Sequence, residues 1–213
     1  MDNWKRLAEL MVEVQIIARD VKDEAVLSAM REVPRHVFVP EDCVSDAYID
    51  RPLPLGEFQT ISQPFIVARM TELLSVESGM KILEIGGGSG YQAAVLSYLG
   101  AVVWSLERVG ELVARAKNNL AAADIKAHMI WKDGFEGYPE EAPYDRIIIT
   151  AAVDEIAQTW MDQLTENGLL VAPVKVSDQV ERLLLRKKNG EDKWFEYCRF
   201  VPLMHDIQKE RLT

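Results

Sequence analysis

The sequence predicts an α/β protein built on a doubly wound, mostly parallel sheet. From residue 81 onward, short apolar runs alternate with amphipathic stretches, which is the order of elements in a parallel sheet covered by helices on both faces. The run at 146–149 contains three consecutive isoleucines and is apolar on both faces, as in a central parallel strand. A glycine-rich turn at 86–90 follows the first apolar run directly, which gives the outline of a β-α-β nucleotide site.

The core elements follow from this alternation of apolar runs. We expect strands at 81–85, 102–107, 126–131, 145–150 and 168–174. The helices between them are expected at 90–99, 109–122 and 154–165. The runs 180–187 and 194–201 flank Asn189-Gly190 and predict an antiparallel hairpin at one edge of the sheet.

The segment before residue 81 has a different character. Apolar residues at helical spacing predict helices at 4–19, at 23–30 with Asp23 as N-cap, and at 64–76 with Pro64 in the first turn. Four prolines fall between residues 34 and 63. We expect an irregular segment there, with one short helix near 41–46.

Length and composition favour one cytoplasmic domain. The 213 residues suit a single α/β domain, divided into an N-terminal addition (1–63), a cofactor-binding core (64–174) and edge strands with a tail (175–213). The net charge of −10 argues against broad attraction to nucleic acid. No apolar run is long enough to span a membrane, no signal peptide is visible, and two cysteines fit a reducing compartment. We expect a monomer.

The glycines at 86, 88 and 90 form a G-x-G-x-G turn. A dinucleotide fingerprint would continue with a small residue where this chain has Tyr91, and that bulk argues against close packing over a pyrophosphate. Glu84 stands two residues before the first glycine. An acid beside the loop suits a cofactor without phosphates, even a cationic one such as S-adenosylmethionine.

Two further strand ends carry candidate cofactor ligands. Glu107 ends the second strand, where a carboxylate can accept hydrogen bonds from both ribose hydroxyls. Asp133-Gly134 follows the third strand, where the acid can accept from an adenine amino group. The alternative is that Glu107 is a solvated strand end and Asp133-Gly134 a plain turn. The three histidines have no metal-ligand spacing, so no metal site is expected.

Several motifs resemble the protein-L-isoaspartate O-methyltransferase family. The most specific is Gln59-Thr60-Ile61-Ser62-Gln63-Pro64, because many methyltransferases share the glycine loop. Other matching stretches are 34–40, 51–56, 83–94, 138–148 and 199–203, so that the resemblance covers roughly residues 4–204.

The resemblance implies a Rossmann-like, seven-stranded methyltransferase fold with a helical N-terminal addition and an antiparallel edge strand. It also implies methyl transfer from S-adenosylmethionine to the α-carboxylate of L-isoaspartyl residues in damaged proteins, with S-adenosylhomocysteine as product and a succinimide on the repair path. Ser62 matches the family's active-site serine. Expected substrate-binding residues are Thr60, Ile61, Ser62, Val201 and Pro202, and expected cofactor-binding residues are Glu84, Gly86, Gly88, Ser89, Gly90, Glu107, Asp133 and Gly134.

Three positions depart from the family pattern, namely Gly87, Lys132 and Glu181. Gly87 stands where Thr or Ser is usual, and we expect a slightly looser loop. These departures leave two alternatives open. One is a methyltransferase of this family that acts on another carboxylate or a small molecule. The other is a non-catalytic protein that binds S-adenosylmethionine. A nicotinamide dehydrogenase is disfavoured by Tyr91.

Overall fold

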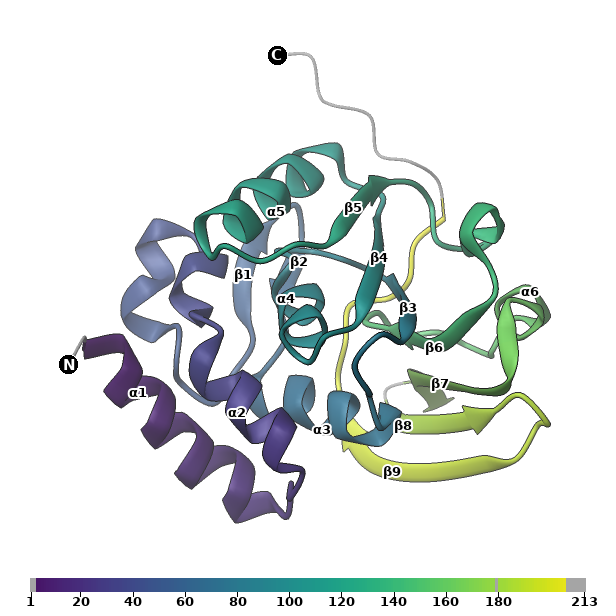
Figure 1. Ribbon diagram of the computed structural model, residues 1–213, viewed down its shortest axis with the longest axis horizontal. Coiled ribbons are helices and arrows are strands. Elements are labelled where there is room, and N and C mark those ends of the chain that lie inside the picture. Colours follow the sequence, from purple (N-terminus) through teal and green to yellow (C-terminus); the bar gives the residue numbers. More distant parts are fainter. Residues whose placement is uncertain (1–2, 179, 206–213) are drawn as a thin grey trace.

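The computed structural model describes residues 3–178 and 180–205, so the outermost ends of the expected domain, 1–2 and 206–213, lie outside it. Its centre is a twisted sheet in the order β5-β4-β3-β6-β7-β8-β9 (Figure 1). The pairings from β5 to β7 are parallel and the last two are antiparallel. The strands are β3 (Lys81–Ile85), β4 (Val102–Glu107), β5 (His128–Trp131), β6 (Tyr144–Ile149), β7 (Leu164–Ser177), β8 (Val180–Lys187) and β9 (Asp192–Cys198). The predicted fold class is confirmed.

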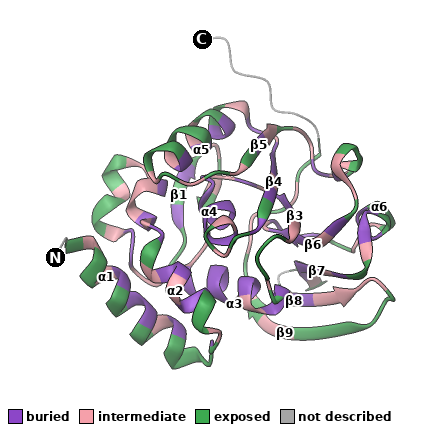
Figure 2. Ribbon diagram, viewed as in Figure 1, coloured by how far each residue is buried: buried purple, intermediate pink, exposed green. Residues whose placement is uncertain are grey.

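Alternate residues of the central strands belong to two apolar clusters, one on each face of the sheet. On β3, Ile82 packs into the cluster with α3 (Pro64–Leu74), α4 (Tyr91–Tyr98) and α5 (Gly110–Ala122), whereas Leu83 and Ile85 pack into the cluster with α6 (Gln158–Asp162). Helices α3 and α4 are mostly buried (Figure 2). Both faces of the sheet are therefore covered, as the apolar strands require.

The N-terminal addition is helical, as predicted, and its helices pack in the same apolar cluster as α3 and α4. Helix α1 (Asn3–Met11) continues as a π-helical turn and a 3₁₀ turn to Arg19. Helix α2 (Glu24–Glu32) begins after Asp23, whose side chain accepts the Ala25 and Val26 N–H groups at 2.9 and 3.1 Å. The predicted N-cap is thus confirmed. Short 3₁₀ turns follow at Arg35–Phe38 and Glu41–Asp46.

The structure contains a hairpin that the sequence did not predict. Strand β1 (Leu53–Gly56) pairs with β2 (Gln59–Ile61), and the turn residues Glu57 and Phe58 have φ angles of 50° and 58°. Hairpin turns of this kind favour asparagine or glycine, which occupy neither position. The usual turn signal is therefore absent from the sequence.

Two predicted elements on the β7 side had wrong boundaries. Helix α6 spans Gln158–Asp162 instead of 154–165, and β7 already starts at Leu164. The chain stays extended at 152–153 because Ala152 bridges to Pro202 and Val153 to Val174. Strand β9 ends at Cys198, and the chain then leaves the sheet edge to reach Ala152.

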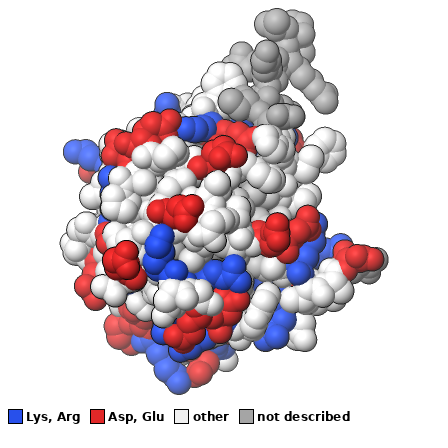
Figure 3. All heavy atoms as spheres, turned by 90° about the vertical axis from the view of Figure 1, so that its right-hand side faces the viewer, with Lys and Arg blue, Asp and Glu red and all other residues white. Residues whose placement is uncertain are grey.

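Charged side chains are mixed on the face of the molecule that Figure 3 presents. Basic groups there lie among acidic groups instead of forming one patch. Within residues 3–178 and 180–205, no helix is long and apolar enough to cross a membrane.

Candidate active site

Three cavities meet at the carboxyl ends of the parallel strands, where ligands bind in open α/β sheets. The strand-end cavity lies beside Gly86, Glu107 and Gly134. The Glu84 cavity also touches Gly86 and lies between the glycine loop and α4. The Ser62 cavity shares Thr60, Ser62 and Thr150 with the Glu84 cavity. These shared residues join the three cavities into one cleft.

The glycine loop presents its backbone to this cleft. The N–H groups of Gly86 and Gly87 both donate to the Leu106 carbonyl at 2.9 Å, which ties the loop to the end of β4. Gly86 has a φ of 100°, and a Cβ there would stand 2.5 Å from the Thr150 hydroxyl. Glycine is therefore required at this position by both conformation and space.

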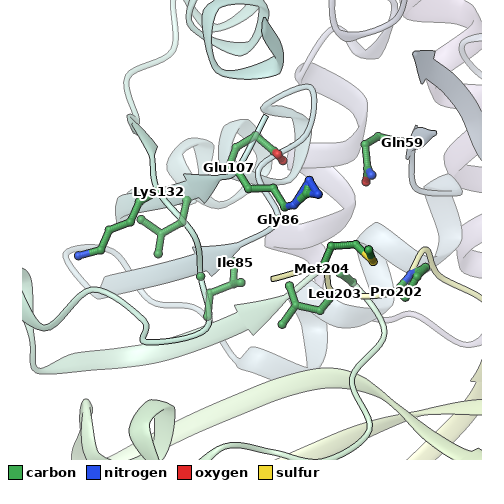
Figure 4. A pocket seen from close by; sticks show the side chains of 12 residues that line it. Gln59, Ile85, Gly86, Glu107, Lys132, Pro202, Leu203 and Met204 are labelled. Atoms are coloured by element: carbon green, nitrogen blue, oxygen red, sulfur yellow. The ribbon is translucent and has the colours of Figure 1, made fainter. Parts of the chain in front are cut away.

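Glu107 lies at the wall of the strand-end cavity. Its carboxylate accepts the Gly88 N–H at 2.9 Å and the Val109 N–H at 2.8 Å. Burial raises the pKa of Glu107, and these backbone N–H groups work against that rise. The carboxylate faces Gln59 across the cavity, with Met204 on a third side (Figure 4). Because each carboxylate oxygen has a further lone pair, Glu107 can still accept from a diol.

Asp133 and Gly134, in the turn after β5, are placed differently from one another. Gly134 lines the strand-end cavity, and a Cβ there would overlap the Ile85 side chain. The Asp133 carboxylate instead accepts the Phe135 N–H at 2.9 Å and lies 3.0 Å from His205 Nδ1. The expected contact of Asp133 with adenine therefore stays a prediction. The Lys132 side chain turns away from the cavity (Figure 4) and donates to Glu140 at 2.7 Å.

Glu84 is a buried carboxyl on the wall of the second cavity. It is 0% exposed, and neither of its oxygens has a hydrogen-bond partner among the described residues. Burial raises its pKa to about 8; the nearby Ser105 hydroxyl opposes the rise without making a hydrogen bond of regular geometry, and the charge of Glu107 adds to it. A buried carboxyl without a partner is costly, so this geometry suits a ligand that brings a hydrogen-bond donor or a positive charge.

Gly87 is packed more closely than its sequence suggested. A Cβ at this position would overlap the Ser105 hydroxyl and stand 2.7 Å from the Met129 methyl group. Ser105 and Met129 thus fill the space that a side chain at 87 would need. The expectation of a slightly looser loop stays a prediction, because filled space beside Gly87 does not fix the freedom of its backbone.

Ser62 lies between the Glu84 cavity and the Ser62 cavity. It follows β2 directly, so the unpredicted hairpin carries Thr60 and the buried Ile61 to the same place. The Ser62 carbonyl accepts from Arg35 Nη2 at 2.7 Å.

Arg35 is itself fully buried, donates from Nε to the Ala47 carbonyl at 2.8 Å, and stacks 4.8 Å from the Tyr91 ring centroid. Sequence reasoning missed Arg35 because nothing in its local pattern indicates burial.

Thr150 is a second residue that sequence reasoning missed. It directly follows β6, and its hydroxyl lies 3.0 Å from the Ile85 carbonyl, to which it donates. It lines both the Glu84 cavity and the Ser62 cavity. Its position at a central strand end was the available signal, because Gly86 follows β3 in the same way and Glu107 ends β4.

The segment after β9 forms a wall between two of the cavities. The Ala152 N–H donates to the Val201 carbonyl and the Leu203 N–H to the Ala152 carbonyl, both at 2.8 Å. Val201 lines the Ser62 cavity and Pro202 the strand-end cavity. The Glu181 carboxylate accepts the Phe200 N–H at 2.7 Å and so holds this segment to the sheet.

The residues present fit S-adenosylmethionine. The strand-end cavity offers a carboxylate acceptor for a ribose diol, and the adjoining Glu84 cavity offers a carboxyl without a partner for a cationic group. The glycine loop lies between the two and brings backbone close to both. Across residues 3–178 and 180–205, no group of three His, Cys, Asp or Glu side chains could hold a metal ion.

Comparisons with known proteins agree with this geometry. A protein from Methanoculleus marisnigri, named protein-L-isoaspartate O-methyltransferase, is 52% identical over 89% of this chain and 86% of its own. The protein of the same name from Methanospirillum hungatei is 50% identical over 95% and 96%.

A solved structure from Plasmodium falciparum, described as such an enzyme in complex with S-adenosyl-L-homocysteine, has a TM-score of 0.79 at 25% identity. It covers 96% of this chain and 99% of that one. The sequence model of the family described as Protein-L-isoaspartate(D-aspartate) O-methyltransferase matches residues 6–208. The chain therefore belongs to the protein-L-isoaspartate(D-aspartate) O-methyltransferase family.

Proposed function

We propose that this protein transfers a methyl group from S-adenosylmethionine to the α-carboxylate of L-isoaspartyl residues in damaged proteins. The observation that supports this most is the position of Ser62. It borders both the cavity that suits the cofactor's cationic end and the Ser62 cavity beside the tail segment. A substrate in the Ser62 cavity would thus meet the cofactor beside the Ser62 hydroxyl group.

In the cofactor half of the cleft, each predicted cofactor-binding residue that lines a cavity has a proposed contact with S-adenosylmethionine. Glu107 accepts from the ribose hydroxyls, and Gly134 keeps backbone close to the adenine. The loop residues Gly86, Gly88, Ser89 and Gly90 give backbone contacts, and Glu84 faces the cationic amino acid part of the cofactor. The buried carboxyl then gains the partner that it lacks among the protein's own described groups.

The chemistry asks little of the protein beyond alignment. When bound, the cofactor supplies an electrophilic methyl group on a sulfonium. The substrate carboxylate is already a nucleophile at neutral pH, so no general base is needed. Fixing the carboxylate oxygen in line with the methyl carbon can supply about 7–11 kcal/mol in favourable cases. Val201 and Pro202 in the tail wall, with Thr60 and Ile61 opposite, help to exclude water.

Ser62 is the proposed donor to the substrate carboxylate. A neutral hydroxyl orients the anion while leaving an oxygen lone pair available for attack, whereas a buried arginine pair would hold the anion more firmly. Arg35 acts as a positioning residue because it donates a hydrogen bond to the Ser62 carbonyl. After transfer, the next backbone amide nitrogen of the substrate attacks the ester carbonyl, methanol leaves, and a succinimide forms whose hydrolysis partly restores aspartate.

Paired peptides test this function. One peptide carries an L-isoaspartyl residue and the other a normal aspartyl residue at the same position. We expect methyl transfer from labelled S-adenosylmethionine to the first and not to the second. Equal transfer to both, or transfer only to small carboxylic acids, would point to a different acceptor. Binding of S-adenosylhomocysteine without transfer to any acceptor would indicate a non-catalytic protein.

We further propose that the protein works as a monomer in the cytoplasm. Cys43 and Cys198 are both free thiols in the structure, which suits a reducing compartment. Burial raises the pKa of Cys198 to about 12, so its thiol stays protonated and unreactive at neutral pH although it borders the Ser62 cavity.

A further inference from the structure

A row of three large side chains crosses one face of the β8–β9 hairpin. The Arg182 guanidinium lies 5.3 Å from the ring centroid of Tyr197 and 5.9 Å from that of Trp194. Arg182 pairs with Tyr197 and Leu184 with Trp194, with a register shift between the two pairs. Because Arg182 and Leu184 lie two residues apart on β8, their partners Tyr197 and Trp194 share the face of Arg182. We call Trp194, Arg182 and Tyr197 the aromatic–arginine row.

The row is open to solvent although its rings are large and apolar. Tyr197 is 72% exposed and Trp194 is 40% exposed. Tyrosine, tryptophan and arginine are the residues that most often dominate binding energy at protein interfaces. Here the Arg182 guanidinium lies against both rings on one edge hairpin. Such a cluster differs from the single apolar residues that are scattered over ordinary protein surfaces.

The row is continuous with the proposed substrate site. Tyr197 stacks on Arg182 and also lines the Ser62 cavity, and Arg199 lines the same cavity two residues further on. Neither Arg182 nor Arg199 forms a salt bridge with a carboxylate among the described residues. In a chain of net charge −10, Arg199 beside the Ser62 cavity and Arg182 against the neighbouring Tyr197 offer a local attraction for acidic groups.

We propose that the aromatic–arginine row, continued by Arg199, binds the polypeptide that flanks the isoaspartyl residue and favours acidic side chains in that flank. This inference rests on the proposed function and deepens it, since it names the sequence context of the preferred substrate. An extended peptide that leaves the Ser62 cavity passes Tyr197 first and Arg182 and Trp194 after it. The rings offer stacking area and the guanidinium groups offer partners for carboxylates.

Three blocked isoaspartyl peptides test the proposal: a minimal one, a long one with glutamates flanking the isoaspartyl residue, and a long one with lysines there. For the wild type we expect kcat/KM to be highest with the glutamate flank and lowest with the lysine flank. The glutamate advantage should shrink as salt is added, because exposed charges are screened. Equal values for the two long peptides would overturn the proposal.

Variants then assign the effect to the row. Arg182→Gln should reduce the glutamate advantage by about fivefold, which is the upper range for an exposed charge pair. Trp194→Ala should raise KM for both long peptides. The matched control is Lys193→Gln, which also removes one positive charge. Lys193 precedes Trp194 on β9 but lies on the opposite face, where its register partner Leu185 packs. Tyr98, exposed at the end of α4, is the control position for loss of an aromatic ring.

The minimal peptide separates failure of this proposal from failure of the proposed function. If the wild type does not methylate the minimal isoaspartyl peptide, the proposed function is wrong. If it does, and Arg182→Gln changes the rate on the minimal peptide as much as on the long ones, the row supports the tail segment and does not bind the flank. An equal loss in Lys193→Gln would likewise assign the effect to net charge and overturn the proposal.

Discussion

The two halves of the cleft are built in opposite ways. The cofactor half consists of the ends of β3, β4 and β5, which are neighbours in the sheet and close in sequence, and most of its contacts come from backbone. The substrate half brings together the β1–β2 hairpin and the tail after β9, which are more than 130 residues apart. Single side chains, chiefly Arg35 and Glu181, hold these two segments in place.

This difference indicates that the backbone of the cofactor half is held more firmly than the segments of the substrate half. The glycine loop is held by paired backbone hydrogen bonds, and neighbouring side chains leave no room for a Cβ at Gly86 or Gly87. The substrate half depends on fewer contacts and carries exposed side chains such as Tyr197. We therefore expect changes in the cofactor half to affect binding strongly, and changes in the substrate half to affect turnover or preference without loss of cofactor.

The largest effect should come from Glu107→Ala. This change removes the proposed acceptor for two ribose hydroxyls and leaves the Gly88 and Val109 N–H groups without their acceptor. We expect affinity for S-adenosylhomocysteine, measured by calorimetry, to fall about 100-fold, since charged hydrogen bonds contribute about 1.5–3 kcal/mol each. Glu111→Ala, an exposed acid in the first turn of α5, is the control and should leave affinity unchanged. Unaltered affinity in Glu107→Ala would remove the proposed role.

The next effect tests the substrate half alone. Ser62→Ala should lower kcat on an isoaspartyl peptide by about 10- to 100-fold, the value of one hydrogen bond to a charged group. Affinity for S-adenosylhomocysteine should change by less than about twofold, because the proposed hydrogen bond of Ser62 goes to the substrate carboxylate and not to the cofactor. Ser62→Thr, which keeps a hydroxyl, should retain part of the activity, and Ser45→Ala serves as an exposed control. A wild-type rate in Ser62→Ala would show that alignment comes from other groups.

The third prediction concerns pH and the buried Glu84. Its pKa of about 8 means that it is mostly protonated at neutral pH in the unliganded protein. A cationic ligand needs the ionised form, so affinity for S-adenosylhomocysteine should rise about tenfold per pH unit as pH increases toward 8 and level off above it. Calorimetry in buffers of different ionisation enthalpy should show proton release on binding near pH 7. Glu84→Gln should bind more weakly and lose this slope, and a slope that survives the change would come from another group.

Stability should show the opposite trend in the unliganded protein. A carboxyl whose pKa is raised by folding stabilises the fold below its unfolded pKa and loses that contribution as pH rises through about 8. Thermal unfolding without ligand should therefore occur at lower temperature at pH 9 than at pH 6. Glu84→Gln should reduce the difference, since the neutral amide does not titrate.

Local spacing predicted the grouping of the cofactor half, whereas the substrate half was named only from the family resemblance, for a physical reason. Strand ends in a parallel sheet are fixed by local apolar periodicity, so Gly86, Glu107 and Gly134 could be brought together from spacing alone. The approach of the hairpin to the tail depends on Arg35 and on the extended chain at 152–153, which are long-range contacts without a local signal. Asp133 shows the limit within the cofactor half, because its carboxylate is engaged by the Phe135 N–H and His205.

The smallest effect should come from Glu181, one of the positions where the chain departs from its family. Its carboxylate accepts the Phe200 N–H at 2.7 Å and holds the tail wall, which Val201 and Pro202 continue. Glu181→Gln keeps an acceptor oxygen and should raise KM for an isoaspartyl peptide by less than about threefold, whereas Glu181→Ala should raise it by about tenfold. Neither variant should alter affinity for S-adenosylhomocysteine by more than about twofold if the two halves are as separate as their construction suggests. Because Pro202 also borders the strand-end cavity, a parallel loss of cofactor affinity in Glu181→Ala would show that the tail couples the two halves.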